Sequence, residues 1–160
     1  MAKLDFLIRL IKERNIESVE PSNEVSRAYL EKSRRYIGTS NLLFNNERFE
    51  ESISMSYYSM YYSLLSLLFK VGIKSENHTA SIILLKDVFN INNSKISFAK
   101  SQRVDKQYYI DFKITKEDSK ELIEISQAFN AELESTIMKI KEEDIKRYKK
   151  IFEEWLIKRG

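Results

Sequence analysis

Apolar residues recur at helical spacing along most of this chain, and one stretch is apolar on nearly every side. Residues Met55–Val71 carry no charge until Lys70 and contain no proline or glycine. A helix that is apolar nearly all round is typically buried. Small side chains form one narrow stripe along it, at alternating steps of four and three: Ser52, Ser56, Ser59, Ser63 and Ser66. The pattern predicts a central helix whose serine stripe lets a neighbouring helix approach closely.

Weaker patterns before this stretch predict two further helices. A short first helix is indicated by one apolar edge, made of Leu4, Leu7, Ile8 and Ile11. After a connector at Asn15–Pro21, Ser22 or Asn23 is a plausible cap for a longer second helix. Its mostly apolar stripe comprises Val25, Ala28, Tyr29, Lys32, Tyr36, Leu43 and Phe44. Because the turn at Asn45-Asn46 is short, we expect the second and central helices to be antiparallel.

The chain after the central helix predicts further helices joined by polar turns. Gly72 stands where a left-handed residue ends a helix, and Lys74–His78 is predicted to be a loop. An apolar helix then opens at Thr79-Ala80-Ser81, and Asn90–Ser94 is a turn. Lys95–Tyr109 is less clearly periodic, which suggests a helix followed by an irregular segment.

The last part of the chain carries two apolar stripes that do not line up. Thr115 and Asp118 resemble a capping box, which starts a helix that extends to about Ile140. The next apolar set is about 140° out of phase at 100° per residue: Ile145, Tyr148, Phe152 and Trp155. Either the helix bends near Glu142, or the tail docks on a different surface, such as the first helix or a second subunit.

These patterns predict an all-α fold, an antiparallel bundle of four to five core helices with an extended C-terminal helix. Three glycines and one proline leave little material for a turn-rich sheet protein. We expect one domain over residues 1–160, with its core at about 24–138 and a C-terminal extension at 142–160. The charged N-terminus is unlike a signal peptide, and no apolar run is long enough for a membrane span, so a cytoplasmic location is expected.

The composition of the chain excludes some classes of catalysis but does not identify a function. The chain has no cysteine and one histidine, which excludes thiol catalysis and disfavours a metal site, and no cofactor is expected. The net charge of +3 permits nucleic acid or an acidic partner without requiring either. The tyrosines of the central helix have core spacing, so packing is favoured over a small-molecule pocket.

Two candidate sites emerge from the residues themselves. His78 stands at a loop-to-helix boundary, where it can be a cap or backbone partner or, alternatively, a catalyst. Arg103 and Lys106 lie one helical turn apart with Lys100 on the same side, and Tyr108 and Tyr109 follow. Such a cluster can bind a phosphate while a tyrosine stacks on a base. The alternative is a solvated basic face in which Arg103 pairs with Asp105 or Asp111.

Two segments of the chain resemble the HEPN family (higher eukaryotes and prokaryotes nucleotide-binding). The segment SMSYYSMYYSLLSLLFKVGIKSENHTASIILL is similar to the family's helix pair, which joins an aromatic helix to a histidine-containing helix start. The segment QRVDKQYYIDFKITKEDSKELIEISQAF is similar to the Arg-x-Asp-x-Gln-Tyr-Tyr segment and last core helix of small archaeal and bacterial members. The resemblance covers about residues 24–138.

The resemblance implies an all-α bundle, commonly a homodimer, with functions that differ between members. Many are metal-independent ribonucleases in which an arginine and a histidine four to six residues later form a composite site across the dimer. Others are toxins held in check by a partner nucleotidyltransferase, or non-catalytic binding modules. Here Tyr108, Tyr109 and Ile110 occupy the positions expected for that histidine. Tyrosine is a poor general base at neutral pH, because its ordinary pKa is about 10.

Two functional hypotheses follow. In the first, the protein binds RNA or a nucleotide in a groove at a dimer interface, lined by Lys100, Arg103, Lys106 and Tyr109. Cleavage would then use Arg103 with Tyr108 or His78, and the protein would belong to a toxin–antitoxin or defence system. In the second, the chain is a non-catalytic interaction module for a nucleotidyltransferase, a hypothesis supported by the apolar tail.

Overall fold

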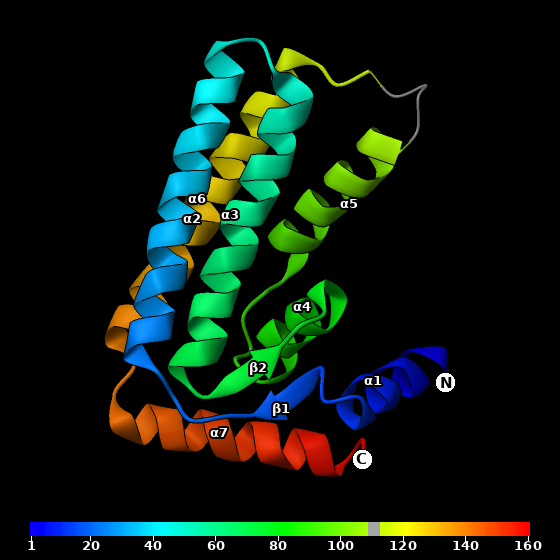
Figure 1. Ribbon diagram of the computed structural model, residues 1–160, viewed down its shortest axis with the longest axis vertical. Coiled ribbons are helices and arrows are strands. Elements are labelled where there is room, and N and C mark those ends of the chain that lie inside the picture. The colour runs from blue at the N-terminus through cyan, green and yellow to red at the C-terminus, as the bar shows by residue number, and fades with distance from the viewer. Residues whose placement is uncertain (109–112) are drawn as a thin grey trace.

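The computed structural model describes residues 1–108 and 113–160, and the side chains of residues 104–108 lie outside the description. Seven helices and two short strands follow one another in this described part: α1 (Ala2–Lys12), β1 (Ile16–Ser18), α2 (Asn23–Asn45), α3 (Phe49–Lys70), β2 (Ile73–Ser75), α4 (His78–Asp87), α5 (Ser94–Tyr108), α6 (Lys116–Lys139) and α7 (Glu142–Ile157). The predicted all-α bundle with a C-terminal helix is confirmed, and a small sheet is added to it (Figure 1).

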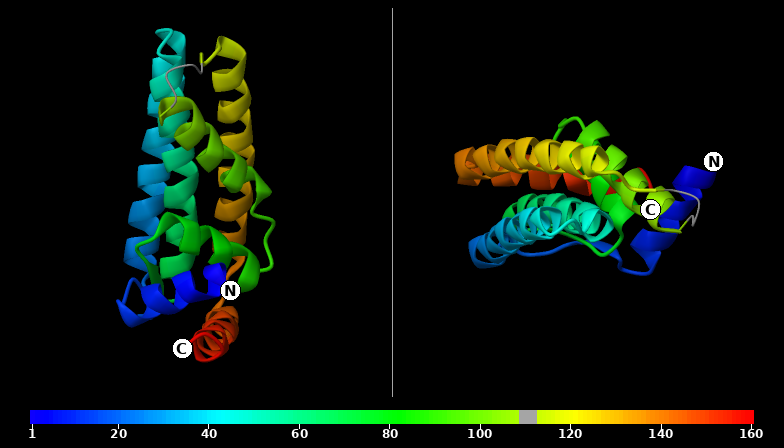
Figure 2. Two further views of the ribbon diagram at one scale, coloured as in Figure 1. Left: turned by 90° about the vertical axis from the view of Figure 1, so that its right-hand side faces the viewer. Right: turned by 90° about the horizontal axis from the view of Figure 1, so that it is seen from above.

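Helix α3 lies at the centre of the molecule, as its sequence predicts. It contacts α2, α4, α5, α6 and β2. Figures 1 and 2 show α2 and α3 side by side, α6 behind them and α5 along the other flank of α3. The side chains of Leu64, Leu67 and Leu68 are completely buried, and so is that of Tyr57. This helix therefore supplies much of the core and sets the position of its neighbours.

The interface between α2 and α3 is a serine seam, defined by Ser26, Ser33 and Ser40 of α2 and the serine stripe of α3. Ser26 and Ser66 share a hydrogen bond of 2.9 Å between their hydroxyl oxygens. Equivalent pairs join Ser33 to Ser63 at 2.8 Å and Ser40 to Ser56 at 2.6 Å. These buried hydroxyls are satisfied by one another and by carbonyl groups, as buried polar groups must be.

The serine seam corrects the predicted stripe of α2. The predicted residues Tyr29 and Tyr36 are only half-buried and flank the seam, and Ala28 is exposed. Tyr36 packs edge-on against Tyr62, with ring centroids 4.9 Å apart. The predicted stripe followed the apolar residues of this helix and did not include its serines, which are the buried residues of the interface. In a seam of small side chains, paired serines are buried and the larger rings are displaced to its edges.

The predicted helix ends agree with the structure at three positions. The Ser22 hydroxyl accepts a hydrogen bond from the Val25 amide at 3.1 Å. Thr115 and Asp118 form the reciprocal bonds of a capping box, at 3.1 and 3.0 Å. Gly72 follows α3 in the left-handed region, with φ of +83°.

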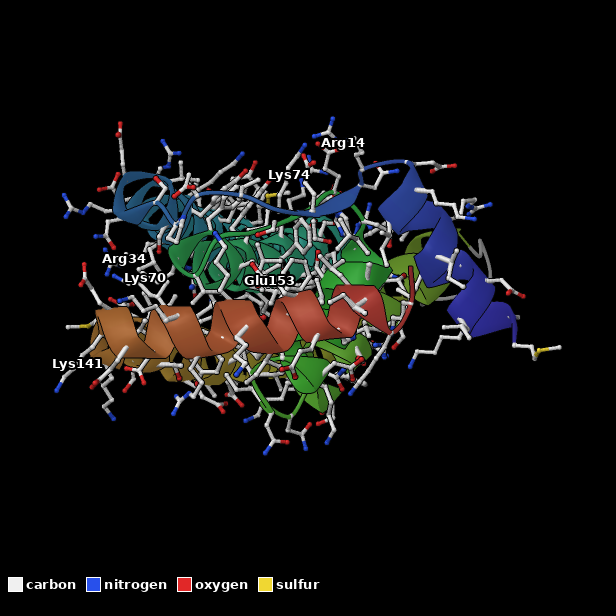
Figure 3. The ribbon with its side chains drawn as sticks, turned by 90° about the horizontal axis from the view of Figure 1, so that it is seen from below. Arg14, Arg34, Lys70, Lys74, Lys141 and Glu153 are labelled. Atoms are coloured by element: carbon white, nitrogen blue, oxygen red, sulfur yellow. The ribbon has the colours of Figure 1, made fainter. Side chains whose placement is uncertain are left out.

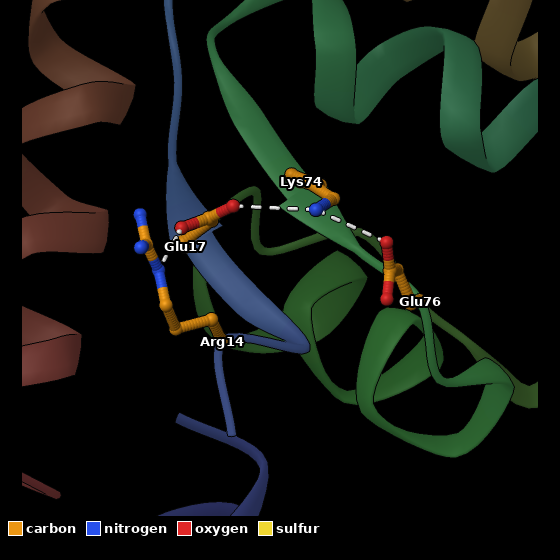
Figure 4. Close-up of polar contacts among 4 residues, drawn as sticks. All are labelled: Arg14, Glu17, Lys74 and Glu76. Carbon is orange, nitrogen blue, oxygen red and sulfur yellow. Dashed lines mark hydrogen bonds and ion pairs between the residues drawn. The ribbon is translucent and has the colours of Figure 1, made fainter. Parts of the chain in front are cut away.

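A two-stranded antiparallel sheet stands where two connectors were predicted. β1 pairs with β2, so that Ile16 faces Ser75 across the ladder. Lys74 binds Glu17 at 3.2 Å and Glu76 at 3.0 Å, and Arg14 also binds Glu17, at 3.0 Å (Figure 4). Each strand has three residues, too few for a period-two pattern to be visible in the sequence. The sheet ties the segment before α2 to the segment after α3.

Helix α7 lies across the lower end of the bundle. Figure 3 shows it from below, with Lys141 near its start. The chain turns at Ile140, where ψ is +122°, and α7 buries Phe152 and Trp155. The Trp155 indole donates a hydrogen bond of 2.9 Å to Asp87, at the end of α4. Of the alternatives predicted for the tail, the structure therefore has a break followed by docking on the chain's own surface, with contacts to α4 and β1.

Candidate functional site

His78 is held by the tyrosines of α3. It is the first residue of α4, and the side chain of Asn77 caps that helix by accepting a 3.0 Å hydrogen bond from Ala80. The imidazole stacks on Tyr61 with 3.8 Å between ring centroids and 14° between planes. Its Nδ1 lies 2.7 Å from the Tyr57 hydroxyl. Asn77, and not His78, is therefore the cap, and within the described residues no backbone carbonyl is a partner of the imidazole, so the two structural roles predicted for His78 are not observed.

Arg103 approaches the same tyrosines from α5. Ile96 and Ala99 are completely buried and fix this face of α5 against the bundle. The Arg103 guanidinium carbon lies 4.8 Å from the ring centroid of Tyr58 and 5.6 Å from that of Tyr57. The His78 ring lies 6.2 and 5.8 Å from those two centroids. His78 and Arg103, which are far apart in the sequence, therefore meet over one pair of aromatic rings.

The charge of Arg103 is not neutralised by a carboxylate in the part of the chain that the structure describes. Its Nε is buried and has no hydrogen-bond partner there. The carboxylates predicted as partners, Asp105 and Asp111, lie outside the described side chains. A buried donor without a partner costs free energy, so an added acceptor at this position would be stabilising.

Lys100 brings a second cation to this position. It lies one helical turn before Arg103, and its Nζ donates a 2.5 Å hydrogen bond to the Thr79 hydroxyl. Burial lowers the pKa of Lys100, and the neighbouring charge of Arg103 lowers it further. The contact with Thr79 links α5 to the first turn of α4, so the two cations and His78 occupy one patch.

Burial and positive charge both favour the neutral form of His78. Burial lowers its pKa below the ordinary value, and Arg103 and then Lys100 lower it further. Burial also raises the pKa of Tyr57 far above its usual range, so this phenol keeps its proton. The contact with Tyr57 occupies Nδ1, and among the described residues no hydrogen bond reaches Nε2. At neutral pH the ring is therefore an uncharged imidazole with one nitrogen open to a ligand.

We name this group the His78–Arg103 cluster. Its members are the polar side chains and the rings that hold them: Tyr57, Tyr58, Tyr61, His78, Thr79, Lys100 and Arg103. Arginine and lysine side by side can bind the oxygens of a phosphate. An uncharged imidazole next to them can accept a proton from, or donate one to, a hydroxyl group. Within the described ranges, no group of three or more metal-ligating side chains could hold a metal ion.

A family model for the HEPN domain matches residues 26–136. The chain belongs to the HEPN domain family. The matched HEPN region begins within α2, ends within α6 and includes the whole His78–Arg103 cluster. Helices α1 and α7 and strand β1 lie outside it. A search among curated proteins finds no match to this chain.

The structure of this HEPN protein brings together only part of the predicted site. His78, Lys100 and Arg103 meet, as described above. Lys106 and Tyr108 belong to α5, but their side chains lie outside the description, and Tyr109 lies outside the described residues. Among the described helices, none has the length and apolar character needed to span a bilayer.

Sequence reasoning missed the tyrosines that form the base of the cluster. Tyr57 and Tyr61 were assigned to core packing, and both are indeed buried. They also hold the imidazole by a hydrogen bond and by stacking. One available signal was the phenol group itself, since a buried hydroxyl needs a polar partner. The partner was a histidine on the next helix.

Proposed function

We propose that this HEPN protein binds RNA, with Arg103 and Lys100 holding a phosphate group next to His78. The observation that carries the proposal is the buried Nε of Arg103, which has no hydrogen-bond partner in the described part of the chain and lies near a second cation, Lys100. Two neighbouring cations that no described carboxylate neutralises favour the binding of an anion. A phosphate supplies the negative charge, and its oxygens can accept a hydrogen bond from the Arg103 guanidinium.

The surrounding side chains favour a nucleic acid over free phosphate. Tyr58 is half-buried and already carries the guanidinium over its ring. Aromatic rings next to cations suit a nucleotide, whose base can stack while its phosphate is bound. The open Nε2 of His78 can form a hydrogen bond with a ribose 2′-hydroxyl, the group that distinguishes RNA from DNA.

A salt titration of RNA affinity tests this proposal. We expect Arg103→Gln and Lys100→Gln each to weaken binding of a labelled single-stranded RNA. Each should also lower the slope of log affinity against log salt by about 0.7, the value for one lost phosphate contact on a single strand. Arg35→Gln is a matched control, because Arg35 is an exposed cation on α2. Equal affinity of wild type and Arg103→Gln, or no binding by wild type at low salt, would refute the proposal.

Cleavage of the bound RNA is a second candidate function, favoured by the neutral His78 beside Arg103. In this hypothesis His78 takes the proton of the 2′-hydroxyl as that oxygen attacks the adjacent phosphorus. The bond from phosphorus to the 5′-oxygen of the next nucleotide breaks, which leaves a 2′,3′-cyclic phosphate and a 5′-hydroxyl that takes its proton from water, and Arg103 stabilises the charge on the phosphate. Incubation of RNA with wild type and His78→Gln, in the presence of a chelator, tests it. Cleavage products that persist in His78→Gln would exclude the imidazole from any chemical role.

The assembly of the protein stays a prediction. We infer a homodimer from its family, and sedimentation of the purified chain would test this. The alternative function, an interaction module for a nucleotidyltransferase, rested on an apolar tail in need of cover. Because Phe152 and Trp155 are buried against the same chain, that argument no longer supports it. A role in a toxin–antitoxin or defence system follows only if RNA binding or cleavage is found.

A further inference from the structure

A groove adjoins the His78–Arg103 cluster at its Lys100 edge. It has a volume of about 540 Å³ and lies between α1, α4 and α5, which come together at one end of the molecule (Figure 2). Its apolar walls are Phe6, Ile82 and Ile83. Lys100 belongs both to this groove and to the cluster, and its hydrogen bond to Thr79 lies at the boundary between them. A ligand that binds the cations can therefore extend directly into the groove.

The lining of the groove has the character of a nucleobase site. Small-molecule sites are typically about 300–1,000 Å³ and mainly apolar, with a few polar groups that fix orientation. Here the side chain of Phe6 is half-buried, so part of its surface is accessible. The Ser97 and Ser101 side chains add hydroxyl groups, and Lys3 adds a cation on the α1 side. A flat base would contact the apolar walls while the hydroxyls reach its polar edge.

We propose that this groove binds a base of the RNA whose phosphate is held by Lys100 and Arg103. The inference rests on the proposed function, because the phosphate contact is what brings the base to the groove. It makes α1, a helix outside the matched HEPN region, part of the RNA-binding surface. The occupant is a nucleobase rather than a peptide, because lysines stand at both sides of the groove and none of the described residues that line it carries a carboxylate.

A pair of probes separates base binding from phosphate binding. One is a short labelled oligoadenylate, and the other is an oligomer of equal length and charge that lacks the bases. Wild type should bind the oligoadenylate at least about fivefold more tightly, the lower limit for one stacked base. Arg103→Gln should weaken both probes by the same factor.

Filling the groove should remove the preference for the oligoadenylate over the abasic probe and leave phosphate binding unchanged. Ser97 is an exposed residue of α5, so Ser97→Trp places a large ring in the groove without disturbing the core. It should reduce oligoadenylate affinity to that of the abasic probe and leave abasic affinity unchanged. Phe6→Leu should reduce the preference in the same direction. Ser135→Trp, at an exposed serine of α6, is the matched control and should behave as wild type.

The outcomes distinguish this inference from the proposed function. If wild type binds both probes equally, or if Ser97→Trp and Phe6→Leu keep the full preference, the base site is refuted while RNA binding stands. If wild type binds neither probe at low salt, the phosphate site and the base site are refuted together.

Discussion

The serine seam makes a sharp prediction about the volume available between α2 and α3. Ser33 is 2% exposed and lies at its middle. Its hydroxyl bonds to the Ser59 carbonyl at 2.7 Å and to the Ser63 hydroxyl at 2.8 Å. Ser33→Ala removes these bonds and adds no atoms. Ser33→Leu removes the same bonds and adds a branched side chain where two helices are in contact.

The two substitutions should differ in free energy of unfolding, because Ser33→Ala only removes hydrogen bonds whereas Ser33→Leu also adds volume between the helices. Ser63 keeps a second partner in Asn130, at 3.0 Å, so Ser33→Ala leaves no orphaned group there. The loss of about 1 kcal/mol for a hydrogen bond is partly offset by the higher helix propensity of alanine. We therefore expect Ser33→Ala to cost about 0–1 kcal/mol. Overpacking adds about 1–3 kcal/mol, so Ser33→Leu should cost about 1–4 kcal/mol.

Thermal and guanidinium unfolding, followed by circular dichroism, measure these differences. In a chain of this size 1 kcal/mol corresponds to about 2–4 °C in Tm. Glu31→Leu is the matched control, since Glu31 is exposed on the same helix and surface changes stay within about 0.5 kcal/mol. A Ser33→Leu protein as stable as wild type, or one more stable than Ser33→Ala, would show that the seam is not closely packed.

Four further predictions concern the cluster and the parts of the fold that support it. His78 is the one histidine in the chain, so its NMR titration should be a single curve with a pKa below the ordinary 6.5, and Arg103→Gln should raise that pKa. Since the unfolded chain then binds the proton first, unfolding experiments should show stability falling as the pH drops below about 6.5 towards the folded-state pKa. Gly72→Ala should cost at least about 2 kcal/mol in denaturant unfolding, because φ is +83° and the new Cβ would collide with the Val19 carbonyl oxygen. Trp155→Phe, which loses the bond to Asp87, should cost about 1–2 kcal/mol in the same assay.

Each of these predictions has a control and a contrary result. Arg14→Gln removes a cation that pairs with Glu17, away from the imidazole, and should leave the histidine titration unchanged. A wild-type pKa at or above 6.5 would contradict the described burial of His78. Gly38→Ala should be neutral or stabilising, since a Cβ there meets nothing within 4 Å. If Trp155→Phe and wild type unfold together, the contact of α7 with α4 contributes no stability.

Local signals in the sequence predicted the parts of the fold that depend on neighbouring residues. Ser22 and Thr115 cap helices because their hydroxyls reach amides three residues away, and Gly72 adopts a conformation that other residues avoid. The burial of α3 followed from its lack of charge. Each of these features depends only on residues within about one helical turn or within one helix.

Features that depend on distant pairing were not predictable in this way. Ile16 and Ile73 are buried in strands of three residues whose partners lie more than fifty residues apart in the sequence. The seam of α2 was missed for a related reason. Ser26, Ser33 and Ser40 recur every seven residues, yet a serine on a single helix does not reveal that another serine faces it. Only the two stripes considered together predict the seam.

The candidate site likewise combines residues that the sequence indicated one by one with contacts that depend on residues distant in the sequence. The sequence indicated His78, Lys100 and Arg103 as separate candidates, but the packing of α4 and α5 against α3 is what brings them together. Tyr57 bonds to His78 and lies under Arg103, so one buried side chain positions both groups. The spacing of an arginine and a histidine along the chain is therefore a poor measure of whether a site exists here. Two helices packed on a third can bring the same two groups together at a different spacing, and a search for such sites must compare positions in space.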